Sequence, residues 1–361
     1  MQLESYLRDL ALLPGLSGHE QAVSRYMQAH FEKLGLPATV DTLGNTIATI
    51  QGSDPAAPPL LITAHMDQLG FVVKTILPDG FLKLERVGGI PEKVLPALHL
   101  VVQARDGRLI PGVVGVKSHH LTPPEEKYKV EPYTVLFVDI GCTSRQQVLD
   151  LGIQVGSPVL YQPCFQRLEG KRCSGTAFDD RAGCAILLAL ADRLAKRQPT
   201  ATVYLAGTVQ EEYTIRGAVL AARATRPKLC ICLDITMEGG TPDLRGVNEV
   251  VMGGGPVLSL YNFHGRGTLN GTIPHPAMVR LLEDTAQAAG LPLQRVATIG
   301  GLTELAYMQL EGDGICGVDL DFPCRYTHSP VELCDLGDLE LTTQLLEAAV
   351  YTITPGLPLH R

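Results

Sequence analysis

The sequence predicts a mixed α/β fold, a sheet flanked by helices, with an all-β domain inserted into it. Three observations carry this prediction. After about residue 180, helical patterns alternate with apolar runs of strand type, as in a sheet covered by helices on both faces. Between residues 71 and 163 the pattern is almost entirely of strand type. Residues 1–70 combine both patterns, so the chain leaves the α/β domain and returns to it at about residue 164.

The first segment predicts two helices followed by short strands. Apolar residues recur at helical spacing through residues 3–34, interrupted by the turn-like sequence PGLSGHE. Residues 47–50 and 60–64 are short apolar runs of strand type. We therefore expect a helix, a turn and a second helix, and then two strands.

The inserted block predicts β-hairpins. Asp79-Gly80 and Asp106-Gly107 each lie between two strand-like runs, and Asp-Gly in that position is a strong hairpin signal. Strand-like runs continue at YTVLFVDIG and SPVLYQ, and only QQVLDLG has a helical pattern. We expect residues 71–163 to form a separate β domain.

The last segment predicts the alternating elements of the sheet. Its strand-like runs are residues 202–209, 229–233 and 315–320. Its helical patterns are residues 181–196, 217–224, 276–289 and 336–350.

Composition places the chain among globular proteins. Its 361 residues are 45% hydrophobic and 19% charged, which suits about two domains and argues against disorder. Thirty basic and 38 acidic residues give a net charge of −8, the wrong sign for neutralising phosphates. We expect no nucleic-acid partner.

Membrane association and secretion are also not expected. The first residues lack a basic stretch followed by an apolar one, and the longest apolar run, residues 184–191, is far shorter than the roughly 20 residues of a membrane span. The nine cysteines are an odd number, many lie in apolar runs, and they form no CxxC pair. We expect reduced thiols, a cytoplasmic protein and no thiolate zinc site.

Candidate metal ligands follow several of the predicted strands. His65 comes directly after residues 60–64, and Asp67 is placed to orient its ring, as a metal-bound imidazole requires. Asp179 and Asp180 precede a predicted helix, where either one also suits a helix cap. Each of these residues alone has an ordinary structural explanation.

The remaining candidates are more acids and a second histidine. Glu211 and Glu212 end the apolar run VYLAGTVQEE, which we interpret as a buried strand that would point the two side chains apart. An unpaired carboxylate there is costly, so a cation is expected nearby. Asp234 ends the run at residues 229–233, and His328 lies in a loop after another predicted strand.

Taken together, these positions predict a metal site at one edge of the sheet. In open α/β sheets ligands bind at the carboxyl ends of the strands. Two histidines and three carboxylates, with either glutamate as the third, can hold two divalent metals. The absence of thiolates favours zinc, cobalt or manganese, and imidazole ligands argue against calcium or magnesium.

Six segments then carry a resemblance to a known family. PGLSGHE, TAHMD, FDDRAG, TVQEEYTIRGA, LDIT and THSPVE, in that order, resemble the tetrahedral aminopeptidases, dinuclear metallopeptidases that include glutamyl and deblocking aminopeptidases. The resemblance covers nearly the whole chain. It implies two metal ions per subunit, zinc or cobalt first and manganese next, and hydrolysis of N-terminal residues from peptides. The implied metal ligands are His65, Asp179, Glu212, Asp234 and His328.

The resemblance also implies roles for single residues and an assembly. Asp179 would bridge the metals, Glu211 would be the general base, and the Asp179-Asp180 bond would be cis. Asp67, as the carboxylate partner of His65, is the second catalytic residue that we expect. The inserted domain would be β-barrel-like and would mediate dimerisation, and the dimers would form a homododecamer.

Departures from the family and rival functions remain. Gln68 stands where relatives commonly have Glu, and Gly301-Leu302-Thr303-Glu304 departs from Gly-Thr-Asp-Ala in a segment beside the active site. Arg266 supports glutamyl specificity only weakly. A glycosidase also uses two carboxylates, but it leaves both histidines unexplained. A non-catalytic scaffold of the same fold disagrees with the complete set of ligands and base.

Overall fold

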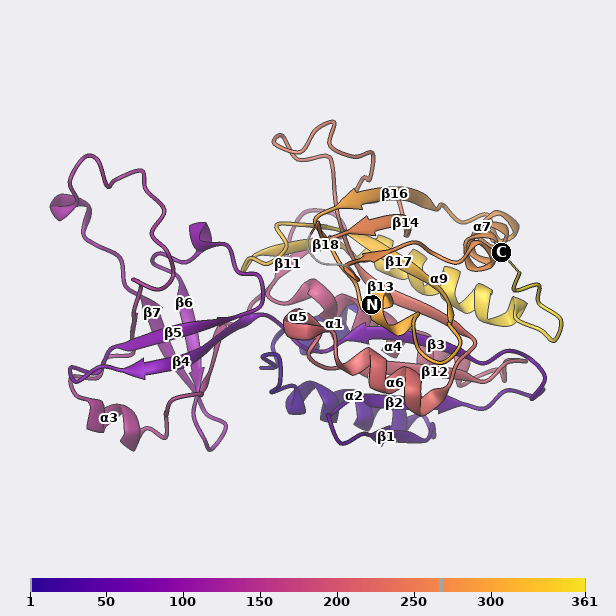
Figure 1. Cartoon of the computed structure of the whole chain (residues 1–361), viewed down its shortest axis with the longest axis horizontal. Coiled ribbons are helices and arrows are strands. Elements are labelled where there is room, and N and C mark those ends of the chain that lie inside the picture. Colours follow the sequence, from indigo (N-terminus) through magenta and orange to yellow (C-terminus); the bar gives the residue numbers. More distant parts are fainter. Residues whose placement is uncertain (1, 266–268, 361) are drawn as a thin grey trace.

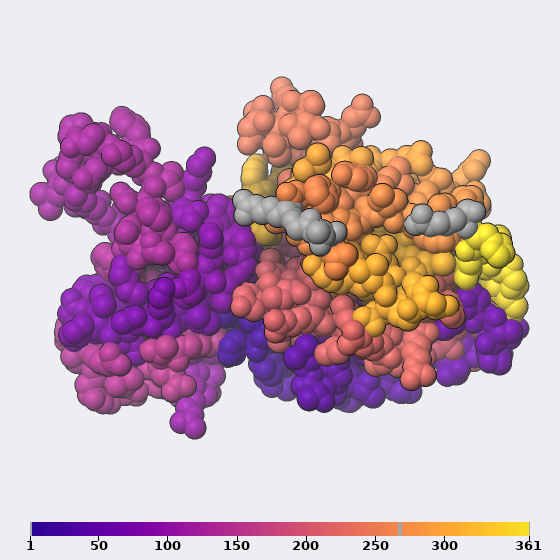
Figure 2. Space-filling model, in the orientation of Figure 1, coloured from indigo at the N-terminus to yellow at the C-terminus, as the bar shows by residue number. Residues whose placement is uncertain are grey.

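The computed structural model describes residues 2–265 and 269–360 and confirms the predicted fold class. A large mixed sheet with its helices forms one lobe, and a separate closed β-barrel forms the other (Figures 1 and 2). Every strand of the barrel lies between Gly70 and Tyr161.

The described residues form a sheet of twelve strands. Its main path runs in the order β1-β2-β12-β3-β13-β17-β18-β11-β10, and β14 pairs with β15, β16 and β17. Neighbours β12, β3, β13 and β17 are parallel, so their carboxyl ends meet at one edge. The bounds are β1 (Ala38–Val40), β2 (Thr46–Ile50), β3 (Leu60–His65), β10 (Phe165–Arg167), β11 (Arg172–Gly175), β12 (Val203–Thr208), β13 (Leu229–Met237), β14 (Val257–Phe263), β15 (Gly271–Thr272), β16 (Gln294–Ile299), β17 (Cys316–Arg325) and β18 (Glu332–Asp335).

Helices cover both faces of this sheet. The main hydrophobic core packs α1, α2, α4, α7 and α9 on one face, and a smaller core packs α6 and α8 on the other. None of the helices in the described ranges is both long and apolar enough to cross a membrane. The bounds are α1 (Gln2–Ala11), α2 (Gln21–Lys33), α3 (Arg145–Asp150), α4 (Phe178–Leu194), α5 (Glu211–Thr214), α6 (Gly217–Thr225), α7 (Pro276–Ala289), α8 (Leu305–Met308) and α9 (Leu336–Thr352).

Strand alternation decides which way the candidate site faces. In β3, Leu60 and Ile62 belong to the main core, whereas Leu61 belongs to the smaller core beneath α6 and α8. Because side chains alternate between faces, His65 at the end of β3 points to the α6 side. The same alternation in β13 places Asp234 on that side too.

The barrel contains the two predicted hairpins. Its strands are ordered β4-β5-β8-β7-β6-β9, and the Asp-Gly turns join β4 to β5 and β6 to β7. The run YTVLFVDIG contributes only the two residues of β8, so the strand predicted there is mostly loop. The bounds are β4 (Gly70–Ile76), β5 (Leu82–Val87), β6 (His99–Gln103), β7 (Leu109–Val114), β8 (Val138–Asp139) and β9 (Pro158–Tyr161), with 3-10 turns η1 (Glu92–Val94) and η2 (His119–Leu121).

Arg181 of α4 connects the turn between α1 and α2 to the centre of the molecule. Its side chain is fully buried, and the guanidinium donates hydrogen bonds to the carbonyl oxygens of Leu10, Leu13 and Gly15 at 2.8, 3.3 and 3.4 Å. A Cβ at Gly15 would lie 2.4 Å from Nη2 of Arg181, so a larger residue there would displace the guanidinium. Burial lowers the pKa of Arg181 to about 10, which keeps it charged at neutral pH.

We predict that Arg181→Met destabilises the fold by about 3 kcal/mol or more, because the carbonyl groups of this turn would lose their buried donor. Urea unfolding followed by circular dichroism measures the effect. Arg25→Met, at an exposed position of α2, is the control and is expected to leave the midpoint in place. Equal midpoints for the two variants would contradict the structural role of Arg181.

Candidate metal centre

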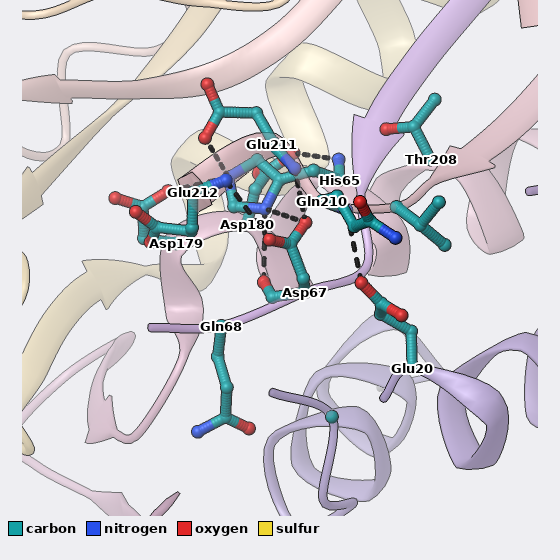
Figure 3. Close-up of polar contacts among 12 residues, drawn as sticks. Glu20, His65, Asp67, Gln68, Asp179, Asp180, Thr208, Gln210, Glu211 and Glu212 are labelled. Carbon is teal, nitrogen blue, oxygen red and sulfur yellow. Dashed lines mark hydrogen bonds and ion pairs between the residues drawn. The ribbon is translucent and has the colours of Figure 1, made fainter. Parts of the chain in front are cut away.

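The structure brings all five predicted ligand residues together. One ligand atom from each of His65, Asp179 and Asp234 lies within 4.8 Å of the others, and the same holds for Asp179, Glu212 and His328. The two groups share Asp179. Figure 3 shows His65, Asp179 and Glu212 converging from separate segments of the chain.

Asp179 and its neighbour have different surroundings. The Oδ1 atom of Asp179 lies 3.1 Å from Nε2 of His65, and its Oδ2 atom lies 3.6 Å from Nε2 of His328. Asp180 instead accepts hydrogen bonds from the backbone N–H groups of Gly183 and His65. The helix-capping interpretation therefore suits Asp180, and the Asp179-Asp180 peptide bond is cis, as predicted.

The local structure predicted for Glu211 and Glu212 is wrong. They do not end a strand: β12 ends at Thr208, and both glutamates lie in the single helical turn α5. The Oε2 atom of Glu211 is 4.0 Å from Nε2 of His65, whereas the Oε2 atom of Glu212 is 3.8 Å from Nε2 of His328. The helical turn, not strand alternation, directs the two side chains to different histidines.

Asp67 supports this turn more than it supports the imidazole. The Nδ1 atom of His65 lies 3.1 Å from the backbone carbonyl oxygen of Asp67 and 3.5 Å from its carboxylate. The carboxylate of Asp67 accepts hydrogen bonds from the backbone N–H groups of Glu211 at 2.9 Å and Glu212 at 3.1 Å (Figure 3). Asp67 therefore fixes the position of α5 relative to the end of β3.

Two further buried acids were not assigned a role from the sequence. Glu332 accepts hydrogen bonds from the backbone N–H of Asp179 at 3.0 Å and that of His328 at 2.8 Å. Glu20 accepts one from the backbone N–H of Gln210 at 3.1 Å (Figure 3). Glu20 is the last residue of PGLSGHE, and Glu332 is the last residue of THSPVE. Their presence in segments that carry the family resemblance was the sequence feature that could have identified them as site residues.

Backbone strain concentrates around the site. Outside glycine, seven described residues have positive φ, and five of them are Ala177, Gln210, Ile215, Tyr326 and His328. Each lies within two residues of a candidate ligand or at the end of α5. Such conformations cost about 1–3 kcal/mol each. The hydrogen bonds accepted by the buried acids stabilise the backbone here and offset part of this cost.

The charges of the site favour bound cations. Burial raises the pKa of Glu211, Glu212 and Asp234 well above the usual value, and neighbouring carboxylates raise it further. Burial opposes protonation of His65, but hydrogen bonds with Asp179 and Asp67 raise its pKa. Among the described residues that line the cavity here, none is Lys or Arg. The donor set of imidazole nitrogens and carboxylate oxygens therefore fits two divalent metal ions.

The departures noted in the sequence fall beside this centre. Residues 300–303 line the same cavity, and Glu304 is buried behind it. Gln68 accepts a hydrogen bond from Arg181 at 3.4 Å. Arg266 lies outside the described residues.

Comparison with known proteins gives one family. The model of the M42 glutamyl aminopeptidases matches residues 44–345. SgcX of Escherichia coli (strain K12), a candidate aminopeptidase, is 42% identical over 92% of this chain and 89% of its own length.

Solved structures give the same result. The aminopeptidase APDkam598 of the archaeon Desulfurococcus kamchatkensis is 30% identical and superposes with a TM-score of 0.92 over 99% of this chain and 97% of its own. The TET1 peptidase of Pyrococcus horikoshii, described as assembling into a tetrahedron or a large octahedral shell, is 28% identical, with a TM-score of 0.85 over 97% of this chain and 100% of its own. The chain belongs to the M42 glutamyl aminopeptidases and is a metal-dependent aminopeptidase of this dinuclear family.

Proposed function

We propose that His65, Asp179 and Asp234 would hold one metal ion and that Asp179, Glu212 and His328 would hold a second, with Asp179 shared between them. The single observation that carries this assignment is the pair of ligand groups that share Asp179. Each group offers one imidazole and two carboxylates, which leaves positions open for water and substrate.

We propose zinc or cobalt as the native metal, with manganese as the next candidate. Imidazole and carboxylate donors without a thiolate suit these ions. When bound, two such ions polarise the peptide carbonyl and lower the pKa of a water molecule towards neutrality.

Glu211 is our candidate for the general base. It belongs to neither ligand group, yet its carboxylate lines the cavity beside His65. A carboxylate in this position takes the proton of the attacking water and returns it to the leaving nitrogen of the peptide bond. Burial and the neighbouring acids Asp234 and Glu212 raise its pKa, which suits a group that must hold the proton between the two steps.

Asp67 and Glu332 are positioning residues in this proposal. Asp67 fixes the backbone of the base and of Glu212, and Glu332 fixes that of Asp179 and His328. Burial and the proximity of Asp179 raise the pKa of Glu332 to about 8, and its two N–H donors oppose this shift.

The substrates we propose are peptides with a free N-terminus, and the protein acts as a self-associated particle. Residues 71–163 form the dimerisation domain of this proposal, and residues 1–70 and 164–361 the catalytic domain. Exposed apolar side chains on the loop between β7 and β8, including Leu121 at 76% and Tyr128 at 95% exposure, support association through the barrel. The tetrahedron described for TET1 supports a homododecamer of dimers.

We propose a cytoplasmic location, in keeping with nine cysteines that form no disulfide.

We predict that Glu211→Gln lowers kcat by about 100-fold or more while both metals stay bound, because the variant cannot accept the proton. Glu212→Gln, one residue away and equally conservative, is expected to lose metal. Activity and metal content by mass spectrometry are measured on the same samples. A Glu211→Gln enzyme with normal turnover would refute the assignment of the base.

Metal removal provides the test of the cofactor. A chelator is expected to abolish hydrolysis of aminoacyl substrates, and separate additions of zinc, cobalt and manganese are expected to restore it to different extents. Failure of all three ions would count against a metal centre of this donor set.

Glu332→Gln is expected to weaken metal binding about 10- to 100-fold, because an amide can accept only one of the two backbone hydrogen bonds. The readout is the affinity for the metal alone, measured by competition with a chromogenic chelator. Glu347→Gln, on the distant helix α9, is the matched control. Equal affinities for the two variants would show that Glu332 does not position the ligands.

A further inference from the structure

The cavity extends well beyond the predicted metal ligands. It has a volume of about 600 Å³, and its lining includes Glu211 and Asp234 as well as residues 300–303, Asn262 and Tyr307. A cavity of this size can take a whole amino-acid side chain. Under the proposed function, the part of the cavity lined by Asn262 and Tyr307, its far part, would receive the side chain of the N-terminal residue.

Asp321 lines this cavity and has no assigned partner. It lies on β17 directly opposite Asp234 of β13 in the parallel register. The residue is 3% exposed, and its Oδ1 atom is buried without a hydrogen-bond partner. It belongs to neither group of predicted ligands.

Asp319 shows what a purely structural acid looks like on the same strand. It lies two residues away on the same face, and its two oxygens accept hydrogen bonds from the hydroxyls of Thr303 at 2.7 Å and Thr272 at 2.9 Å. Asp319 does not line the cavity, whereas Asp321 does. Both oxygens of Asp319 therefore have a hydrogen-bond donor, whereas the Oδ1 atom of Asp321, at the cavity, has none.

The order of the strands places Asp321 between the metal centre and the far part of the cavity. On β14, which is antiparallel to β17, Val257 pairs with Asp321 and Asn262 lies further along, beyond Ser259, which pairs with Asp319. Asn262 also lines the cavity, is 6% exposed and has an Oδ1 atom without a partner. Because β17 lies between β13 and β14, Asp321 lines the cavity wall between Asp234 on one neighbouring strand and the strand that carries Asn262 on the other.

We infer that Asp321 makes the enzyme selective for peptides whose N-terminal residue carries a cationic side chain, lysine or arginine. This inference rests on the proposed function, because the metal centre fixes the N-terminus at one end of the cavity. A buried carboxylate oxygen without a donor is costly, and an ammonium or guanidinium group supplies donors and opposite charge together.

The charge balance of the site supports this selectivity. Two divalent ions would balance the four carboxylates of Glu211 and of the predicted ligands, and Asp321 is a further acid on the cavity wall. Among the described residues of the cavity wall, no Lys or Arg competes for this position.

The test compares substrates with and without a cationic group on the side chain. Lysyl and norleucyl p-nitroanilides share a four-carbon side chain, and only lysine carries a terminal ammonium group. Glutamyl p-nitroanilide represents the opposite preference, which Arg266 would favour. We expect the metal-loaded enzyme to have a kcat/KM for lysine about tenfold or more above that for norleucine. Asp321→Asn is expected to bring this ratio close to one.

Matched variants and a binding measurement keep the result decisive. Asp319→Asn is the control and is expected to keep the lysine preference, and Asp321→Ser repeats the test if Asp321→Asn folds poorly by circular dichroism. A glutamyl preference, or an equal fall in kcat/KM for lysyl and norleucyl substrates, would overturn the inference. If the wild-type enzyme cleaves no substrate, the proposed function fails. Calorimetric binding of lysine amide and norleucine amide to wild type and Asp321→Asn then decides the role of Asp321, and equal affinities would overturn it.

Discussion

The structure depends on a cluster of buried carboxylates that needs positive charge from outside the chain. Asp179, Glu211, Glu212 and Asp234 meet where four parallel strands end, and no Lys or Arg among the described residues lines the cavity they share. A cluster of this kind is unstable alone, because burial and mutual repulsion both disfavour ionisation. Metal binding is therefore part of the stability of this edge of the sheet as well as of its chemistry.

A second layer of acids supports the first through the backbone. Four acids of this layer do not line the cavity: Asp67, Asp180, Glu20 and Glu332. Their carboxylates accept hydrogen bonds from backbone N–H groups of the segments that carry the ligands and the base. These hydrogen bonds hold conformations that non-glycine residues rarely adopt, such as the positive φ of Gln210 and His328. The catalytic geometry is thus fixed by main-chain contacts, so a conservative change in this layer can move a ligand without touching the metal.

Much of this organisation was predictable from sequence because the central strands are short apolar runs that end in a polar residue. His65 and Asp234 were identified in this way, and parallel pairing explains why they meet. The helical turn at Glu211 was not predictable, since it begins after a left-handed residue, Gln210, that no pattern marks. Strands β14 and β16 were also missed. They are held mainly by pairing with each other and with β17, and such long-range contacts leave little trace in local sequence.

The two acids on β17 show the limit of reasoning from residue types. Asp319 and Asp321 share a face of the same strand, so alternation assigns them the same environment. The difference lies in the donors around them: the hydroxyls of Thr303 and Thr272 donate to Asp319, whereas the Oδ1 atom of Asp321 has no donor. Under the inferred selectivity, the residues that donate to Asp319 thus decide which carboxylate of the strand is available to a substrate. Within such a family, specificity can change through the satisfaction of a buried neighbour as readily as through the residue that contacts the ligand.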